Sequence, residues 1–300
     1  MTEDNILKRL SILKLLYKIG VEQSYKGEMT SYFSILSFHD SIEMFLKLTA
    51  EKLDKRDCQN FMQYWEMLDK LTLKEAMRKL NANRVNLKHK GIIPSKFEIE
   101  TSRVNTALFF EENVPKYFDL NFSEINLFEL IKYEHTKAHL KQAEFELKNI
   151  KFKECIHNCV RAFNELLLEY KSSKRSKYSF TTPFDLIKNV SFDNSRSWGN
   201  ENKTPIDKTL KETFKTVNEN FKKIENALQL VSLGIDYKKY IKFSLLSPQF
   251  YKTSNGDYNF YGDEREWSEK ECEFCIDFIL DSSLILQDFD FNFSELSKKK

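Results

Sequence analysis

Apolar side chains recur three and four positions apart through most of this 300-residue chain, which is the spacing of one face of an α-helix. In the first part of the chain, this period predicts helices at about 6–19, 29–53, 58–80 and 95–114. In the second part it predicts helices at about 127–149, 152–170, 205–233, 237–243 and 267–287. The pattern therefore predicts a mainly α-helical fold.

Capping residues indicate where several of these helices begin and end. Ser95 and Glu98 form an S-x-x-E capping box, in which each side chain accepts a hydrogen bond from the backbone N–H of the other. Pro205 suits the first turn of a helix, and Gly234 suits the position just after its end.

Two interruptions are expected in the first part. Gly20 and Gly27 are expected to weaken the end of the first helix, because glycine is a poor helix former. The stretch 81–94 is expected to break the helical pattern, since Gly91 suits a C-cap and Pro94 disfavours helix before it.

The predicted organisation is two helical bundles in tandem, at residues 1–120 and 121–300, with the polar segment 119–126 as the boundary. The second bundle is expected to carry a small β-hairpin at 249–261, because Asn255-Gly256 is a favoured hairpin turn. The segment 171–204 is rich in Ser, Asn and Lys, and we expect a basic loop there that is either disordered and solvated or contacts a partner.

Composition narrows the class of protein. Seven Gly and five Pro are few for this length, which favours helices over turn-rich sheet folds. The 47 basic and 45 acidic residues leave a net charge of +2, which excludes a histone-like nucleic-acid binder. Five cysteines do not suit a disulfide framework, and no signal sequence or membrane span is evident, so we expect a cytoplasmic protein.

The two halves share a weak internal similarity. Residues 39–46 and 160–167 both show a small residue, then an apolar one, then polar positions and an apolar pair. Each segment lies in the second long helix of its half. This favours a duplicated helical bundle, although any two amphipathic helices align to some extent.

Basic residues gather in one window of the first half. Between Met77 and Phe97 the chain has no Asp or Glu, and its cationic side chains are Arg78, Lys79, Arg84, Lys88, Lys90 and Lys96, with His89 among them. Such a run is expected to make a local positive field that attracts phosphate. Arg binds two phosphate oxygens with its planar fork, and His transfers protons near neutral pH.

The spacing of Arg84 and His89, Arg-x4-His after long helices, resembles the Arg-x4–6-His motif of the HEPN superfamily. The resemblance covers about the first 118 residues, and extends to the second half only through the internal similarity. Many members of that superfamily are metal-independent endoribonucleases of toxin–antitoxin, abortive-infection and CRISPR-linked systems, with an active site at a dimer interface.

The resemblance implies a catalytic pair, Arg84 and His89, that cleaves RNA by attack of the 2′-hydroxyl on the adjacent phosphate. It implies a homodimer and no metal or cofactor. The family often has a polar residue after the Arg, whereas this chain has Val85 there and Asn86 one place later. Asn86, Lys88 and Lys90 are therefore candidates for positioning phosphate.

Helix geometry constrains the assignment of Arg84 and His89 as a catalytic pair. Positions five apart on a regular helix differ by about 140° around its axis. Arg84 and His89 are expected to converge only if the helix ends or bends between them.

Two carboxylates on the second predicted helix are supporting candidates. Asp40 and Glu43 are three apart and share a face, from which a carboxylate can orient Arg84 or His89. The alternative, a partly exposed helix edge, is slightly favoured.

Metal sites are disfavoured elsewhere. The pairs Cys155/Cys159 and Cys272/Cys275 have the ligand types of a four-thiolate zinc site. Their helical spacing favours core thiols instead. His135 and His139 are four apart on one helix but lack the H-E-x-x-H pattern.

A non-catalytic function remains an alternative hypothesis to the nuclease. In it the chain is an interaction subunit of a defence or regulatory complex, whose basic window binds RNA or an acidic partner without cutting it. The second half then contacts a partner protein.

Overall fold

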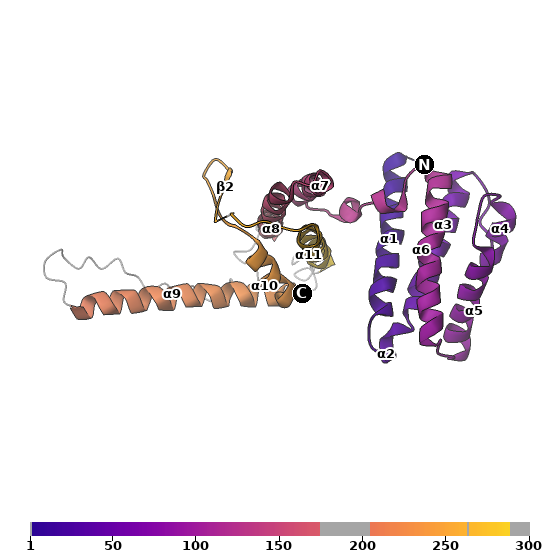
Figure 1. Ribbon diagram of the computed structural model, residues 1–300, viewed down its shortest axis with the longest axis horizontal. Coiled ribbons are helices and arrows are strands. Elements are labelled where there is room, and N and C mark those ends of the chain that lie inside the picture. Colours follow the sequence, from indigo (N-terminus) through magenta and orange to yellow (C-terminus); the bar gives the residue numbers. More distant parts are fainter. Residues whose placement is uncertain (1, 175–204, 263, 289–300) are drawn as a thin grey trace, which may run out of the picture. The chain divides into compact units, whose positions relative to one another are not determined.

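The computed structural model describes residues 2–174, 205–262 and 264–288 (Figure 1). The chain divides into two compact units, Met1–Leu130 and Ile131–Lys300, and each is described by itself. Both units are helical, and the described residues contain one two-stranded sheet, in the second unit. The prediction of a mainly α-helical protein with a small hairpin is confirmed.

Unit 1 is a bundle of long helices, α1 (Glu3–Ser24), α3 (Ser34–Lys52), α5 (Lys74–Lys90) and α6 (Lys96–Phe118). Helix α3 packs against α1, α5 and α6, and so occupies the middle of the bundle (Figure 1). The connections contain short elements: α2 (Glu28–Ser31), η1 (Phe61–Gln63), α4 (Tyr64–Met67), η2 (Phe122–Glu124) and η3 (Leu127–Leu130).

Aromatic rings fill the core of unit 1. Phe45 of α3 lies with its ring centroid 5.4 Å from Phe109 and 6.0 Å from Phe110 of α6, both edge-on. All three side chains are fully buried. Edge-to-face pairs of this kind stabilise a core beyond the area they bury.

The predicted helix over 58–80 is wrong. Helix α4 ends at Met67, and α5 begins only at Lys74, after Leu73 in the left-handed region with φ 59°. Tertiary hydrogen bonds hold the loop between them. Trp65 Nε1 donates to the carbonyl of Thr72, and the backbone N–H of Thr72 donates to Asn113 of α6. These distant partners are not visible in a local hydrophobic pattern.

The expected break over 81–94 is also displaced. Helix α5 continues through Lys90 and ends at Gly91, whose φ of 67° is the left-handed conformation that glycine adopts freely. The backbone N–H groups of Gly91 and Ile92 donate to the carbonyls of Leu87 and Asn86. Gly91 therefore acts as the predicted C-cap, but the helix before it is intact.

The unit boundary lies after Leu130 rather than at residue 120. Phe122 and Ile125 of the polar segment are buried, and the ammonium of Lys14 in α1 donates to the carbonyls of Phe122 and Ser123 at 3.0 Å. The hydroxyl of Ser11 also reaches the carbonyl of Asn126 at 2.8 Å. These contacts attach the segment to α1, and so to unit 1.

Unit 2 contains the helices α7 (Glu134–Lys148), α8 (Phe152–Lys174), α9 (Pro205–Ser232), α10 (Tyr237–Leu246) and α11 (Glu269–Asp288). Helices α7 and α8 form a helical hairpin, α11 packs on both, and α10 packs on α11. Phe163, Phe243 and Phe278 meet in its core with ring centroids 5.0–5.3 Å apart.

The local signals of the second half are confirmed where the structure describes them. Pro205 is the first residue of α9, and Gly234 follows its end with φ 75°. The hairpin pairs β1 (Gln249–Lys252) with β2 (Tyr258–Tyr261) in antiparallel register, Gln249 opposite Tyr261. Of the predicted basic loop, residues 171–174 belong to α8, and 175–204 lie outside the described residues.

The internal similarity falls on α3 and α8, each of which packs on the long helix before it. The duplication itself stays a prediction. No helix in the described part of the chain has both the length and the apolar character of a membrane-spanning segment.

Gly20 does not end α1, which continues to Ser24. A Cβ added at Gly20 would lie 2.8 Å from two ring carbons of Phe38 and 3.2 Å from the Cβ of Ser37. Phe38 is fully buried and has no room to move away. Glycine therefore allows the close approach of α1 to α3, at a cost in helix propensity.

We expect Gly20→Ala to lower the free energy of unfolding by about 1–3 kcal/mol, because overpacking outweighs the gain in helix propensity. Urea unfolding followed by circular dichroism measures the change. Gly27→Ala is the matched control, since nothing lies within 4 Å of a Cβ there. A Gly20→Ala protein as stable as the parent would contradict this account of the helix contact.

Candidate functional site

Arg84 and His89 lie on one uninterrupted helix, α5. The helix neither ends nor bends between them, so their side chains leave its axis about 140° apart. The Arg84 side chain is partly buried, whereas Lys88, His89 and Lys90 are exposed at the end of the helix. Within one copy of unit 1, the convergence that the sequence left open does not occur.

Arg84 instead lies on the side of α5 that faces α3. There His39 is 2% exposed, and its Nδ1–H donates to Asp40 at 3.3 Å. Its Nε2 lies 3.1 Å from Oδ1 of Asn81 on α5. The ring of Phe61 covers His39, with centroids 4.4 Å apart. Each ring nitrogen of this buried imidazole thus has a polar side-chain atom within 3.3 Å, one from α3 and one from α5.

Electrostatics connect this cluster to Arg84. The hydrogen bond from His39 lowers the pKa of the Asp40 carboxyl below its usual value, against the opposing effect of partial burial, and the charges of Arg84 and Lys88 lower it further. Asn81, Arg84 and Lys88 are three and four positions apart, so they share one face of α5. The Asp40 carboxylate therefore lies within electrostatic range of Arg84 and Lys88.

Glu43 occupies the next turn of α3. One of its carboxylate oxygens lies 3.9 Å from Nδ1 of His39, and the other binds Lys47 at 2.8 Å. Ligand atoms of His39, Asp40 and Glu43 lie within 4.8 Å of one another, which is the spacing of a metal site. Lys47 binds Glu43, and the charge of Arg84 acts on Asp40, so positive charge is already present, which disfavours a metal cation there.

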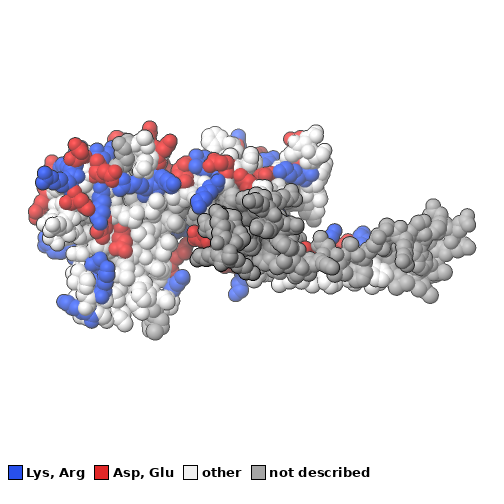
Figure 2. Space-filling view, turned by 180° about the vertical axis from the view of Figure 1, so that it is seen from behind, with Lys and Arg blue, Asp and Glu red and all other residues white. Residues whose placement is uncertain are grey.

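Some cationic side chains of the basic window between Met77 and Phe97 are engaged by neighbouring side chains, so the group that can attract phosphate is smaller than the sequence suggests. Arg78 binds Glu75 at 2.8 Å, and the ammonium of Lys79 lies 5.9 Å from the centre of the Phe97 ring. On the face of unit 1 drawn in Figure 2, basic and acidic side chains alternate rather than forming one positive field. The end of α5 keeps an exposed basic group, with Lys88, His89 and Lys90.

Asn86 and Lys90 complete the predicted set. Asn86 is partly buried and lies about 60° from His89 around the helix axis, but about 160° from Arg84. It is therefore placed to assist His89 rather than Arg84. Lys90 is the last residue of α5 and is exposed.

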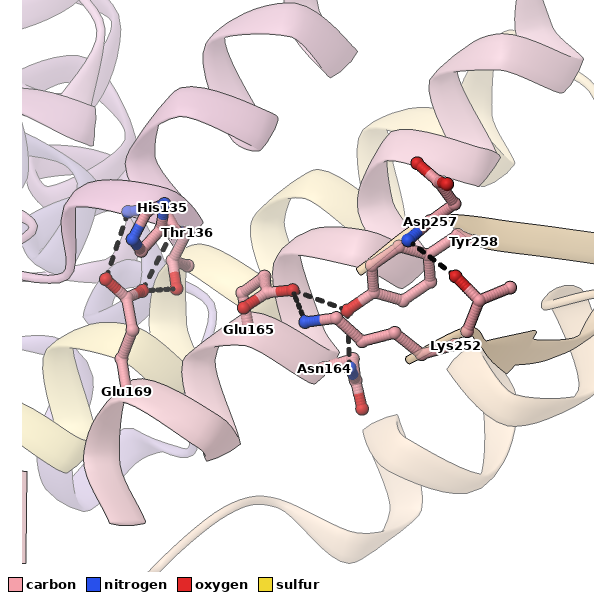
Figure 3. A network of polar contacts seen from close by, with 9 residues as sticks. His135, Thr136, Asn164, Glu165, Glu169, Lys252, Asp257 and Tyr258 are labelled. Carbon is pink, nitrogen blue, oxygen red and sulfur yellow. Dashed lines mark hydrogen bonds and ion pairs between the residues drawn. The ribbon is translucent and has the colours of Figure 1, made fainter. Parts of the chain in front are cut away.

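A second polar network lies in unit 2 and was not predicted (Figure 3). Glu165 of α8 accepts hydrogen bonds from Lys252 at 2.5 Å and from the Tyr258 hydroxyl at 2.6 Å, and Asn164 also contacts that hydroxyl. Burial opposes the charge of Glu165, but the two hydrogen bonds outweigh it and lower the pKa of the carboxyl. The network fastens the β-hairpin to α8.

Glu169 performs a related task one turn later on α8. Its carboxylate accepts from the backbone N–H groups of His135 and Thr136 at 3.0 Å, and from the Thr136 hydroxyl at 2.7 Å. These donors open α7, so Glu169 caps that helix from a neighbouring one (Figure 3). Both carboxylates have structural partners that account for their position.

The four cysteines of unit 2 gather between α8 and α11, all fully buried. In the described residues they do not form a group of three or more ligand atoms within 4.8 Å of one another. Tetrahedral zinc, with Zn–S bonds of about 2.3 Å, needs sulfur atoms roughly 3.8 Å apart. Burial raises the pKa of the Cys159 thiol, as expected for a thiol in an apolar core.

Sequence reasoning missed His39 and Asn81 as the contact that joins α3 to α5. Asn81 lies three positions before Arg84, and this spacing was the available signal. Nothing local indicated which residue of α3 it would meet.

No family model, curated protein or solved structure matches this chain.

The low pKa of Asp40 predicts a specific dependence of stability on pH. Its folded-state pKa lies below the ordinary 3.8, so the carboxylate stabilises the fold above that pH and loses this effect as the pH falls further. We expect Asp40→Asn to reduce the fall in melting temperature between pH 6 and pH 3. Glu75→Gln, on an exposed pair, is the control. An identical pH profile for Asp40→Asn and the parent would argue against the His39–Asp40–Arg84 cluster.

Proposed function

We propose that this protein is a metal-independent endoribonuclease whose active site forms on the C-terminal half of α5. The observation that carries the proposal is the presence of an arginine and an exposed histidine on the same helix, close to a buried polar cluster. The charge of Arg84 acts on Asp40, which neighbours the buried His39, and His89 is exposed between Lys88 and Lys90. A positioned cation and an accessible imidazole are the groups that metal-free cleavage of RNA requires.

Each residue has a defined role in this mechanism. His89 takes the proton of the 2′-hydroxyl or gives one to the leaving 5′-oxygen. Arg84 stabilises the dianionic phosphorane with its planar guanidinium. Lys88 and Asn86, with Lys90, position the phosphate. Asp40 orients Arg84 through its negative charge. Glu43, whose carboxylate lies near His39, helps to position His39 and thereby Asp40.

The divergence on α5 requires two copies of the chain. One helix directs Arg84 and His89 about 140° apart, so one copy does not bring both to one phosphate. A symmetric homodimer places the His89 of one copy near the Arg84 of the other, and supplies the two imidazoles that two proton transfers need. The active site is therefore proposed at a dimer interface of unit 1.

The proposed setting is the cytoplasm, in defence against phage or as a regulated toxin. Unit 2 is the proposed contact for a protein partner, and RNA is the substrate. This setting rests on the resemblance of the Arg84–His89 spacing to the HEPN motif.

A second candidate function is binding of RNA or an acidic partner without cutting. The same 140° divergence favours it, because an arginine and a histidine on different faces of one helix serve binding as well as catalysis.

Cleavage of RNA in EDTA tests the proposal. The parent chain is expected to cut, and His89→Ala to cut at least about 100-fold more slowly, because positioned general acid–base groups contribute this much. Arg84→Ala is expected to cut slowly too. His135→Ala, which removes an exposed imidazole from unit 2, is the matched control and should cut like the parent.

The outcomes separate the two candidates. Cutting that is abolished by EDTA, or unaffected by His89→Ala, would overturn the nuclease mechanism. RNA bound in a mobility-shift assay but never cut, over structured and unstructured RNAs, would establish the second candidate instead.

A further inference from the structure

A partly buried arginine in unit 2, Arg161 of α8, contacts only neutral groups. One N–H of its guanidinium donates to Oδ1 of Asn158 at 3.1 Å, and its guanidinium carbon lies 5.1 Å from the centre of the Phe260 ring in β2. No acidic residue in the described part of the chain forms an ion pair with Arg161. The remaining N–H donors of its planar fork are therefore available to an anion.

Four other arginines of the described chain are each paired with a glutamate: Arg9, Arg78, Arg103 and Arg265. The natural partner of Arg161 is Glu165, because residues four apart share a helix face. The Glu165 carboxylate, however, binds Lys252 at 2.5 Å and the Tyr258 hydroxyl at 2.6 Å (Figure 3). Arg161 thus keeps the desolvation cost of a partly buried charge, which a bound anion would offset.

A histidine of α7 interacts with the same amide as Arg161. Asn158 is 6% exposed, and its own N–H group is fixed by a backbone carbonyl of α8. Burial lowers the pKa of the His139 imidazole, and the charge of Arg161 lowers it further. The Glu165 carboxylate and a hydrogen bond with Asn158 oppose this lowering of the pKa, whereas His135 of the same helix adds to it. His139 and Arg161 therefore converge on one buried amide from two helices.

The charges of this cluster match an anion with two negative charges. Glu165 and Lys252 neutralise each other, so a protonated His139 and Arg161 leave two positive charges. A phosphate monoester carries close to two negative charges near neutral pH, whereas a phosphodiester carries one. The arginine fork binds two of its oxygens, and the imidazolium N–H donates to a third. Such an anion also relieves the repulsion between the two cations.

We propose that Arg161 and His139 bind the dianion of a phosphate monoester, at the contact of α7, α8 and the β-hairpin. This site lies in unit 2, so the inference goes beyond the proposed nuclease and does not depend on it.

A pH titration of the full chain with isotope-labelled histidine, followed by NMR, tests the proposal. Sulfate is the probe, because it has the shape of a phosphate group and stays a dianion over the pH range in which histidine titrates. The reference is sodium chloride of equal ionic strength. Sulfate is expected to raise the pKa of His139 and to bind its protonated form about tenfold more tightly than its neutral form. His135, exposed on the same helix, is the internal control and should respond much less.

Variants of the arginine separate binding from general charge effects. Arg161→Gln is expected to bind sulfate at least about tenfold more weakly, because hydrogen bonds to a charged group are lost. Arg161→Lys keeps the charge without the fork and should restore part of the affinity. Arg265→Gln removes an exposed arginine of the same unit that pairs with Glu271, and is expected to bind sulfate like the parent. Circular dichroism checks that each variant keeps its helices.

The titration of the parent needs no variant, so it decides the question even if Arg161→Gln fails to fold. A His139 pKa that sulfate raises no more than sodium chloride does would overturn the proposal. An unchanged sulfate affinity in a folded Arg161→Gln protein would overturn it too. Dimethyl phosphate, a monoanion, is expected to bind more weakly than sulfate, and equal or tighter binding would contradict a site for a dianion.

Discussion

The burial of α3 is the constraint on which unit 1 depends. Between Ile35 and Ala50 this helix is enclosed by α1, α5 and α6, and its largest side chains, Phe38 and Phe45, are fully buried. A helix enclosed in this way cannot leave a polar side chain without hydrogen-bonding partners. Each ring nitrogen of His39 accordingly lies within 3.3 Å of a polar side-chain atom, and these neighbours, Asp40 and Asn81, link the core to the surface.

That requirement also sets the orientation of α5. Because Asn81 contacts His39, Arg84 follows on the side of the helix toward α3, whereas Lys88 and His89 are exposed. The same geometry directs the arginine and the histidine to different sides of α5.

In unit 2, hydrogen bonds to carboxylates hold peripheral elements in place. Its hairpin and the start of α7 are held by carboxylates of α8, Glu165 and Glu169, through hydrogen bonds to side chains and backbone. In the last three turns of helix α9, by contrast, Leu230 is buried, whereas Phe221, Ile224, Leu228 and Val231 are exposed.

The sequence by itself determined the helical class, the Ser95–Glu98 capping box, the start of α9 at Pro205 and the hairpin turn at Asn255-Gly256. These features depend on groups a few residues apart, so local patterns suffice. The tertiary structure alone decided that Gly20 is a contact with Phe38 rather than a helix end. It also decided that Asp40 lies within electrostatic range of Arg84 and that His89 is exposed, because these outcomes depend on how helices distant in sequence pack and rotate against one another.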